Sequence, residues 1–164
     1  MKTIATMIAT GLALVLQGAF AGAQAVNANG HCTGMTVTDY VESDAEDTTT
    51  SEAWVNVTDG HLTFTTSSTG CVAITFAGNA SASQSGNFEI LHVRTLMDGH
   101  QLCVPAQTSD TFMEAINPSP NVAASITHVC KNLAAGAHTV QVQYSTTGDG
   151  VAQINGHVLT VTHN

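Results

Sequence analysis

Four cysteines carry the chemistry that is easiest to predict from this sequence. No two of them have the C-x-x-C spacing of a redox site or a zinc knuckle. In an exported chain, an even number of scattered cysteines favours disulfide bonds over metal binding or a reactive thiol. Three pairings are possible, and we favour the one between sequence neighbours because it closes loops of moderate length. It joins Cys32 to Cys71 and Cys103 to Cys130.

Eight histidines are many for a chain with so few charged residues, and an exported protein can use histidine to bind zinc or copper. No H-x-H or H-E-x-x-H motif occurs among them. His157 and His163 are expected on one strand face, but about 20 Å of strand separates them, too far to bind one ion together. We therefore interpret the histidines as strand and turn residues and expect no metal and no cofactor. They are His31, His61, His92, His100, His128, His138, His157 and His163.

Half of the carboxylates lie in one acidic segment, residues 39–52. An oxygen-rich segment of this kind can bind calcium. However, the D-x-[DN]-x-[DN]-G motif of a calcium loop is missing, and the segment has no glycine to make its sharp turn. The interleaved Ser and Thr favour a solvated, mobile connection, and calcium binding stays open as the alternative. The acids are Asp39, Glu42, Asp44, Glu46, Asp47 and Glu52.

Motifs that indicate catalysis are missing from the sequence. It contains no G-x-S-x-G, no H-E-x-x-H and no G-x-x-x-x-G-K-[ST], and its many Ser, His and Asp residues single out no triad. We therefore expect a non-enzymatic protein with a binding or surface-structural role, whose partner is an unknown protein or glycan. A small hydrolase is the least favoured alternative.

Carbohydrate binding is the main alternative. β-Sandwich domains often bind sugars through exposed aromatic rings together with Asn, Asp and Gln side chains. Trp54, Tyr40 and Tyr144 are the candidate rings, although aromatic residues make up only 5% of the chain. Trp54 begins a short predicted strand, Ala53–Val57, where packing between two sheets is the expected use of so large a side chain.

Arg94 is the only arginine, and it lies inside the longest apolar strand segment, Phe88–Met97. A buried charge needs a partner, because an isolated one costs far more free energy than its neighbours recover. We therefore predict a structural ion pair between Arg94 and either Glu89 or Asp98.

The first 25 residues have the pattern of a secretory signal peptide. Lys2 supplies a positive start, Ile4–Leu16 form an apolar core, and Ala21–Ala25 offer small-x-small cleavage sites. This apolar core is shorter than a membrane-spanning helix, which needs about 20 apolar residues. We therefore predict a signal peptide over 1–25, a single domain over 26–164, and a secreted product that is extracellular or periplasmic.

The charge balance excludes two classes of partner. After the predicted leader, two cations stand against 12 acids, which leaves a formal charge near −10. Binding to a nucleic acid duplex or to an anionic membrane needs clustered Lys and Arg, and this sequence has none to cluster.

Short segments rich in Val, Ile, Thr, Phe and Tyr alternate apolar with polar residues and are separated by Gly, Asn, Asp and Ser. This pattern predicts strands almost throughout, with a single helical turn at Thr111–Ile116. Strands with one polar face are typical of antiparallel sheets, and many of them at short spacing predict two stacked sheets. The predicted strands are Met35–Val41, Ala53–Val57, His61–Thr66, Cys71–Ala77, Phe88–Met97, Gln101–Val104, Ser125–Cys130, His138–Ser145, Gly150–Ile154 and His157–His163.

Asn155 and Gly156 predict a two-residue type I′ hairpin turn, because both central residues of that turn need a positive φ. The turn would pair the two strands on either side of it and set which side chains share a face. The predicted buried face holds Ala152, Ile154, His157, Leu159, Val161 and His163, and the other face holds Gln153, Val158 and Thr160.

Two segments, Leu91–Gly99 and Leu133–Val161, carry a recognisable order of motifs. An Asp-Gly pair ends the first segment, and an L-x-x-G-x-H-T-V strand, a Gly-containing turn and an L-x-V strand follow in the second. These motifs fall on Asp98, Gly99, Leu133, Gly136, His138, Thr139, Val140, Leu159, Thr160 and Val161.

In these motifs the second half of the chain resembles a loose group of bacterial exported jelly-roll domains, related in shape to the C1q and tumour necrosis factor fold. The resemblance implies no active site. Together with the strand pattern, it implies an all-β fold, an antiparallel β-sandwich of jelly-roll type with about 8 to 10 strands. A homo-oligomer stays open, since the collagen-like Gly-x-y stalk of the C1q relatives is missing here.

Overall fold

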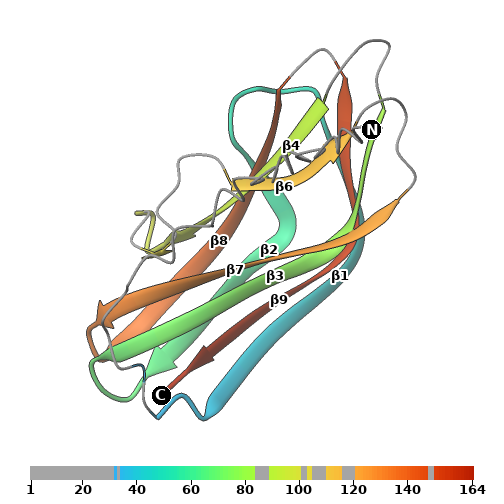
Figure 1. Cartoon of the computed structure of the whole chain (residues 1–164). Helices are drawn as coiled ribbons and strands as arrows, with labels where there is room; N and C mark the ends of the chain where they lie inside the picture. Colours follow the sequence, from blue (N-terminus) through green and yellow to red (C-terminus); the bar gives the residue numbers. More distant parts are fainter. Residues whose placement is uncertain are drawn as a thin grey trace, which may run out of the picture.

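The computed structural model of the chain describes residues 32, 34–83, 89–100, 103–104, 110–115, 121–147 and 150–164. Nine strands and no helix occur over these residues, and the strands form two antiparallel sheets that face each other (Figure 1). The prediction of an all-β, antiparallel sandwich is therefore confirmed. The predicted signal peptide over 1–25 lies outside the described residues.

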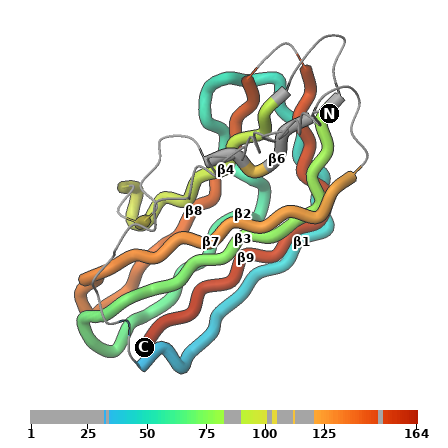
Figure 2. Tube along the Cα trace, in the orientation of Figure 1, coloured from blue at the N-terminus to red at the C-terminus, as the bar shows by residue number. Residues whose placement is uncertain are grey.

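The strands alternate between the two sheets along the chain, so each one lies opposite its sequence neighbours. The five-stranded sheet has the order β1 (Val37–Thr49), β9 (Val151–His163), β3 (Gly70–Ser83), β7 (Val122–Leu133) and β5 (Cys103–Val104). The four-stranded sheet has the order β2 (Val55–Thr66), β8 (Gly136–Thr147), β4 (Glu89–Met97) and β6 (Asp110–Ala115). Figure 2 shows β1 at one margin of the larger sheet, beside β9.

Alternate residues of each strand meet in one apolar core between the sheets, because successive side chains of a strand point to opposite faces. Ile74 and Phe76 of β3 are fully buried, and they lie beside Val161 and Leu159 of β9. Burying a large apolar side chain of this kind contributes roughly 1.5 to 3 kcal/mol. The opposite sheet contributes Leu91, Val93, Met97, Val140 and Val142.

The predicted hairpin at Asn155 and Gly156 is wrong. β9 continues through this position without a turn and pairs with β1 on one side and with β3 on the other. Gly156 instead forms a β-bulge with a φ of 54°, because it has no partner in β3. Its two neighbours pair there with Gly78 and Asn79. The local Asn-Gly preference is satisfied by a bulge, since pairing on both sides of β9 favours an uninterrupted strand.

The predicted buried face of β9 is nevertheless confirmed. Ile154 and His157 flank Asn155 and Gly156. A two-residue turn and a one-residue bulge would both place these flanking residues on the same face of the sheet. All six predicted residues are buried: Ala152, Ile154, His157, Leu159, Val161 and His163.

The helical turn predicted at Thr111–Ile116 is wrong over the described residues. The backbone of Asp110–Ala115 forms β6, which pairs with β4. A single helical turn is unstable in isolation, whereas the free side of β4 offers this segment a ladder of hydrogen-bond partners.

The acidic segment is a strand, which contradicts the predicted mobile connection. Residues 37–49 form β1, which pairs with β9 along most of its length. Its side chains alternate, with Val41 packed against the core and with Asp47 and Thr49 buried. Pairing with β9 thus overrides a composition that is typical of loops.

Candidate functional site

Both predicted disulfides are present. Cys103 and Cys130 are direct partners across β5 and β7, with Cα atoms 4.1 Å apart. Cys32 joins Cys71 near the start of β3, with Cα atoms 5.2 Å apart. All four thiols are therefore used in structural bonds, which is consistent with an oxidising compartment, extracellular or periplasmic.

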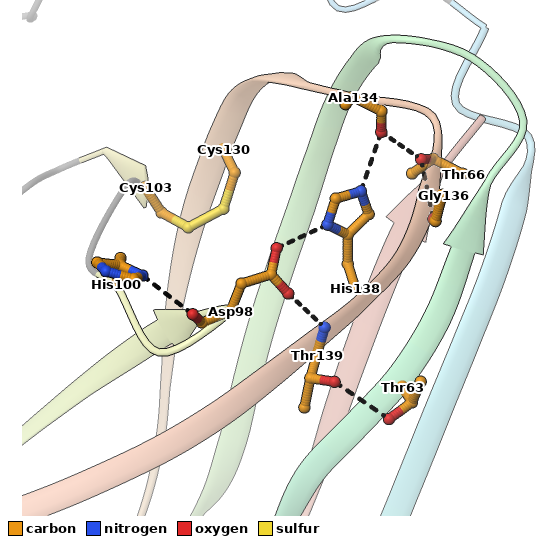
Figure 3. A network of polar contacts seen from close by, with 10 residues as sticks. All are labelled: Thr63, Thr66, Asp98, His100, Cys103, Cys130, Ala134, Gly136, His138 and Thr139. Atoms are coloured by element: carbon orange, nitrogen blue, oxygen red, sulfur yellow. Dashed lines mark hydrogen bonds and ion pairs between the residues drawn. A yellow bond between two sulfur atoms is a disulfide. The ribbon is translucent and has the colours of Figure 1, made fainter.

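A polar network joins the turn after β4 to the start of β8 (Figure 3). Asp98 accepts two hydrogen bonds, from His138 Nδ1 at 2.7 Å and from the backbone N–H of Thr139 at 2.8 Å. The other ring nitrogen of His138, Nε2, lies 2.9 Å from the carbonyl oxygen of Ala134. The Asp-Gly and His-Thr-Val motifs of the sequence therefore meet in space.

Both ring nitrogens of His138 face oxygen acceptors, so only the protonated ring can donate to both. The hydrogen bond with Asp98 accordingly raises the pKa of His138. Burial acts to raise the pKa of Asp98, but the hydrogen bonds from His138 and Thr139 outweigh it and lower that pKa. A general base needs a free ring nitrogen beside the group it deprotonates, and here Nε2 is occupied. The geometry suits a structural role.

A second pair of histidine and carboxylate lies at the same end of the sandwich. His163 Nε2 is 2.9 Å from Asp39 Oδ2. Phe64 contacts both histidines, with its ring centroid 5.8 Å from that of His138 and 5.0 Å from that of His163. Each histidine is nearly buried, while each carboxylate is partly exposed. The two pairs therefore close this end of the core beside Phe64.

The other described histidines are dispersed. Burial lowers the pKa of His92 and of His157. His61 and His100 are exposed, and buried His128 shares a hydrogen bond with Thr95. His31 lies outside the described residues. Within the described ranges, which include all the acids of segment 39–52, no group of three or more His, Cys, Asp or Glu is placed to hold a metal ion.

Arg94 lies in a row of side chains that crosses three strands of the smaller sheet. Its Nε and Nη2 both donate to Gln143 Oε1, at 2.9 and 2.6 Å. Gln143 in turn donates to Asn56 Oδ1 at 2.8 Å. The guanidinium group lies 4.3 Å from the ring centroid of Trp54. This row, Trp54, Arg94, Gln143 and Asn56, holds one charged group in a fixed orientation.

Two sequence predictions concern these residues, one for Trp54 and one for Arg94. Trp54 is not part of the core, so the expectation that it packs between the sheets is wrong. It precedes β2, in which Val55 and Val57 take the inward positions instead. The Asp98 carboxylate, one of the two predicted partners of Arg94, binds His138 instead. The other predicted partner, Glu89, has its side chain outside the described part of the structure, so that ion pair stays a prediction.

A hollow of about 680 Å³ lies across β1, β9, β3 and β7. Small residues make up much of its lining, including Ala77, Gly78 and Gly156. The acidic residues Glu42 and Asp44 belong to the lining contributed by β1, and both are exposed. The hollow therefore combines space with negative charge.

Gly78 and Gly156 both line this hollow, at the point where β3 and β9 approach closely beside the bulge. A Cβ atom on Gly78 would lie only 3.0 Å from the carbonyl oxygen of Gly156 and 3.1 Å from the Cβ of His157. Gly156 itself has a positive φ that residues with a side chain rarely adopt. A Cβ at Gly156 would point into open space, with the nearest backbone oxygen 3.8 Å away on Ser43, so the missing side chain keeps the sheet surface low beside β1.

The charge of the hollow is not balanced by a neighbouring cation. Arg94 and Lys131 are the only Lys or Arg after residue 2. Arg94 belongs to the other sheet, and Lys131 lies seven residues along β7 from Ala124 of the lining, roughly 23 Å away. The described part of the chain therefore leaves Glu42 and Asp44 free to attract an external cation.

His157 also contributes to the lining, and it is buried with only 3% of its surface exposed. Its ring packs 5.2 Å from Phe76. A backbone group of Asp59 lies near the ring, but neither ring nitrogen makes a hydrogen bond of ordinary geometry. Burial holds its pKa down, so the ring is neutral and adds no positive charge to the hollow.

The sequence did not predict this hollow, because Asn155 and Gly156 favour a turn and the predicted strand ends at Ala77, one residue before Gly78. An isolated glycine within a strand pattern also indicates a bulge or a close backbone approach, and this signal was present at Gly78. What the sequence did not reveal is that the two glycines face each other across neighbouring strands.

No known protein family matches the chain, and no curated protein matches it. Over the described ranges, no helix has the length and the apolar character needed to cross a membrane.

Proposed function

We propose that this chain is an exported, non-enzymatic binding module whose hollow receives a positively charged group of its partner. The hollow itself carries the proposal, because its small side chains leave about 680 Å³ of space beside the unbalanced carboxylates of Glu42 and Asp44. An ammonium or guanidinium group placed there gains attraction from both carboxylates, and an open surface lets it keep much of its hydration.

Two further parts of the proposal rest on sequence and fold. Export is supported by the leader pattern over 1–25 and by the two disulfides. The jelly-roll assignment is supported by the strand order, in which successive strands alternate between the sheets and β1 pairs with β9.

The non-enzymatic assignment is supported by His138 and Ser43, because the polar atoms of both side chains already have hydrogen-bond partners. His138 has an acceptor at each ring nitrogen. Ser43 is a residue of the hollow lining, and its hydroxyl donates a hydrogen bond to Asp59 Oδ2 at 3.2 Å. Neither group is held ready for proton transfer or nucleophilic attack.

The test is a titration of the purified secreted form with a fluorescent, Lys-rich peptide. We expect binding that weakens as salt is added, and a loss of affinity of about fivefold in Glu42→Gln. The matched control is Glu52→Gln, which removes the same charge from an exposed position outside the hollow lining. Equal weakening by both variants would show only general charge attraction and contradict the role of the hollow.

A glycan is the second candidate partner, and the row of Trp54, Arg94, Gln143 and Asn56 favours it. Trp54 lies outside the core, beside amide and guanidinium groups that are fixed in orientation. Sugars bind to such combinations of an aromatic ring with polar donors and acceptors.

A glycan array separates this candidate from the first one. If the row binds a sugar, Trp54→Ala should abolish the signal. Tyr40→Ala, which removes an exposed ring from the other sheet, should leave it unchanged. An array without any signal would remove the glycan candidate and leave the charged partner.

A further inference from the structure

We propose that the partner is a protein with a basic, extended segment, and that this segment binds as an additional strand along β1 and places a Lys or Arg side chain in the hollow. This inference rests on the proposed function, because it specifies what occupies the same hollow. Three features of the structure support it: the position of β1, the charge along β1, and the place of the hollow beside β1.

β1 is an edge strand of the larger sheet (Figure 2). Its 13 residues extend over about 43 Å and contain no proline. In such a strand, every second residue directs its N–H and C=O away from the neighbouring strand. In the described part of the chain β1 pairs with β9 alone. From the opposite sheet, β2 is bonded to the side chains of Ser43 and Asp47, and the Tyr144 hydroxyl of β8 donates to the Thr48 carbonyl. The register of β1 shifts between Ser43 and Glu46, so the regular edge that an added strand can use is residues 37–43.

The charge along β1 determines the kind of strand that can join it. Natural sheet edges are often protected against pairing by charged side chains. Here Glu42, Asp44 and Glu46 are all exposed acids. A second copy of this chain would place the same acids opposite them, and like charges on paired strands repel. A basic strand would place Lys or Arg opposite them instead and gain free energy from the match.

The hollow begins at β1, so an added strand would lie next to it. Neighbouring strands are about 4.8 Å apart, and alternate side chains of the added strand would share the face on which the hollow opens. A Lys or Arg side chain at the level of Glu42 has the length to bend over β1 and bring its charge to the carboxylate residues at the near margin of the hollow. Backbone pairing would supply affinity, and the hollow would select the basic side chain.

The test uses a 12-residue peptide of alternating Lys and Thr, and hydrogen exchange on the full secreted chain. We expect the outward-facing amides of residues 37–43 to exchange at least about tenfold more slowly with peptide bound, since these edge amides gain partners. Two N-methylated peptides complete the design, one blocked at the Lys amides and the other at the Thr amides. Only one of these sets faces β1, so one peptide should lose at least about tenfold in affinity and the other should not.

The outcomes separate the inference from the proposed function. If both methylated peptides bind equally and β1 gains no protection, the strand addition is wrong while the hollow remains a cation site. If the unmodified peptide fails to bind, the proposed function fails as well. If β1 becomes protected without peptide as the protein concentration rises, a second copy occupies the edge, and the inference is overturned.

Discussion

At the scale of single residues, the role of each histidine depends on its hydrogen-bond partners more than on its position in the sequence. His138 and His163 each combine a carboxylate with a backbone carbonyl acceptor, and both contact Phe64. His157 is buried without such partners, and its pKa is lowered by burial. The same residue type therefore supplies a stabilising contact at the end of the core and a neutral ring beside the hollow.

The pair of Asp98 and His138 makes stability depend on pH. The raised pKa of His138 means that its contribution is complete below about pH 6.5 and is lost as the pH rises through the raised value. The lowered pKa of Asp98 means that its contribution is complete above about pH 4 and is lost as the pH falls. The pair should therefore stabilise the fold most between these limits.

We predict that Asp98→Asn lowers the free energy of unfolding by about 1 kcal/mol at about pH 5.5, and by less at about pH 8.5, because the carboxylate is partly exposed. Urea unfolding at the two pH values measures both quantities. His61→Gln, at an exposed position of β2, is the control and should leave the pH dependence unchanged. A loss of equal size at both pH values would contradict the protonated state assigned to His138.

At the scale of elements, the bulge in β9 controls both the buried face of that strand and the shape of the sheet surface. Gly156 shifts the register against β3 by one residue, so Ile154 and His157 both point inward. The same residue leaves the space that forms the hollow. One backbone irregularity thus connects the core to the candidate site.

We predict that substitutions of Gly156 act through its positive φ, because a Cβ there has open space, with the nearest backbone oxygen 3.8 Å away. Gly156→Ala should lower the free energy of unfolding by roughly 1 to 2 kcal/mol. Gly156→Asn should lower it less, since Asn tolerates this φ better, and Gly156→Val should lower it more. Equal losses in all three variants, measured by urea unfolding, would show that the conformation is not the cause.

Patterns within one strand predicted most of the elements, whereas contacts between strands decided the errors. Alternation of apolar and polar residues predicted the inward face of β9, because that face depends only on neighbouring positions. Residues 42–49 of β1 and the segment of β6 were misassigned, because each is stabilised as a strand by a partner far away in the sequence. The hollow escaped prediction for the same reason, since Gly78 and Gly156 meet only in the folded sheet.

At the scale of the whole molecule, two disulfides hold a chain whose acids outnumber its cations. With 12 Asp and Glu against three Lys and Arg, the folded chain repels itself. Cys103 and Cys130 fix the two-residue strand β5 to β7, and Cys32 and Cys71 fix the segment before β1 to β3. Each bond restricts the unfolded chain and so favours the compact state.

We predict that replacing Cys103 and Cys130 together by Ser lowers the free energy of unfolding by roughly 3 to 4 kcal/mol, the value expected for a loop of this length. Urea unfolding of the oxidised protein measures the difference. The bond between Cys32 and Cys71 closes a longer loop, with a sequence separation of 39 instead of 27. Its replacement by two Ser residues should therefore lower the free energy of unfolding slightly more. A double variant as stable as the parent would contradict a stabilising role for that bond.

The position of β9 has a consequence for how the chain acquires its fold. β9 is the last described strand in the sequence, yet it lies between β1 and β3 and pairs with both. A nascent chain that has not yet reached Val151 cannot join its first strand to the larger sheet. The larger sheet is therefore completed only after synthesis has passed this point, and its assembly depends on contacts between residues far apart in the sequence.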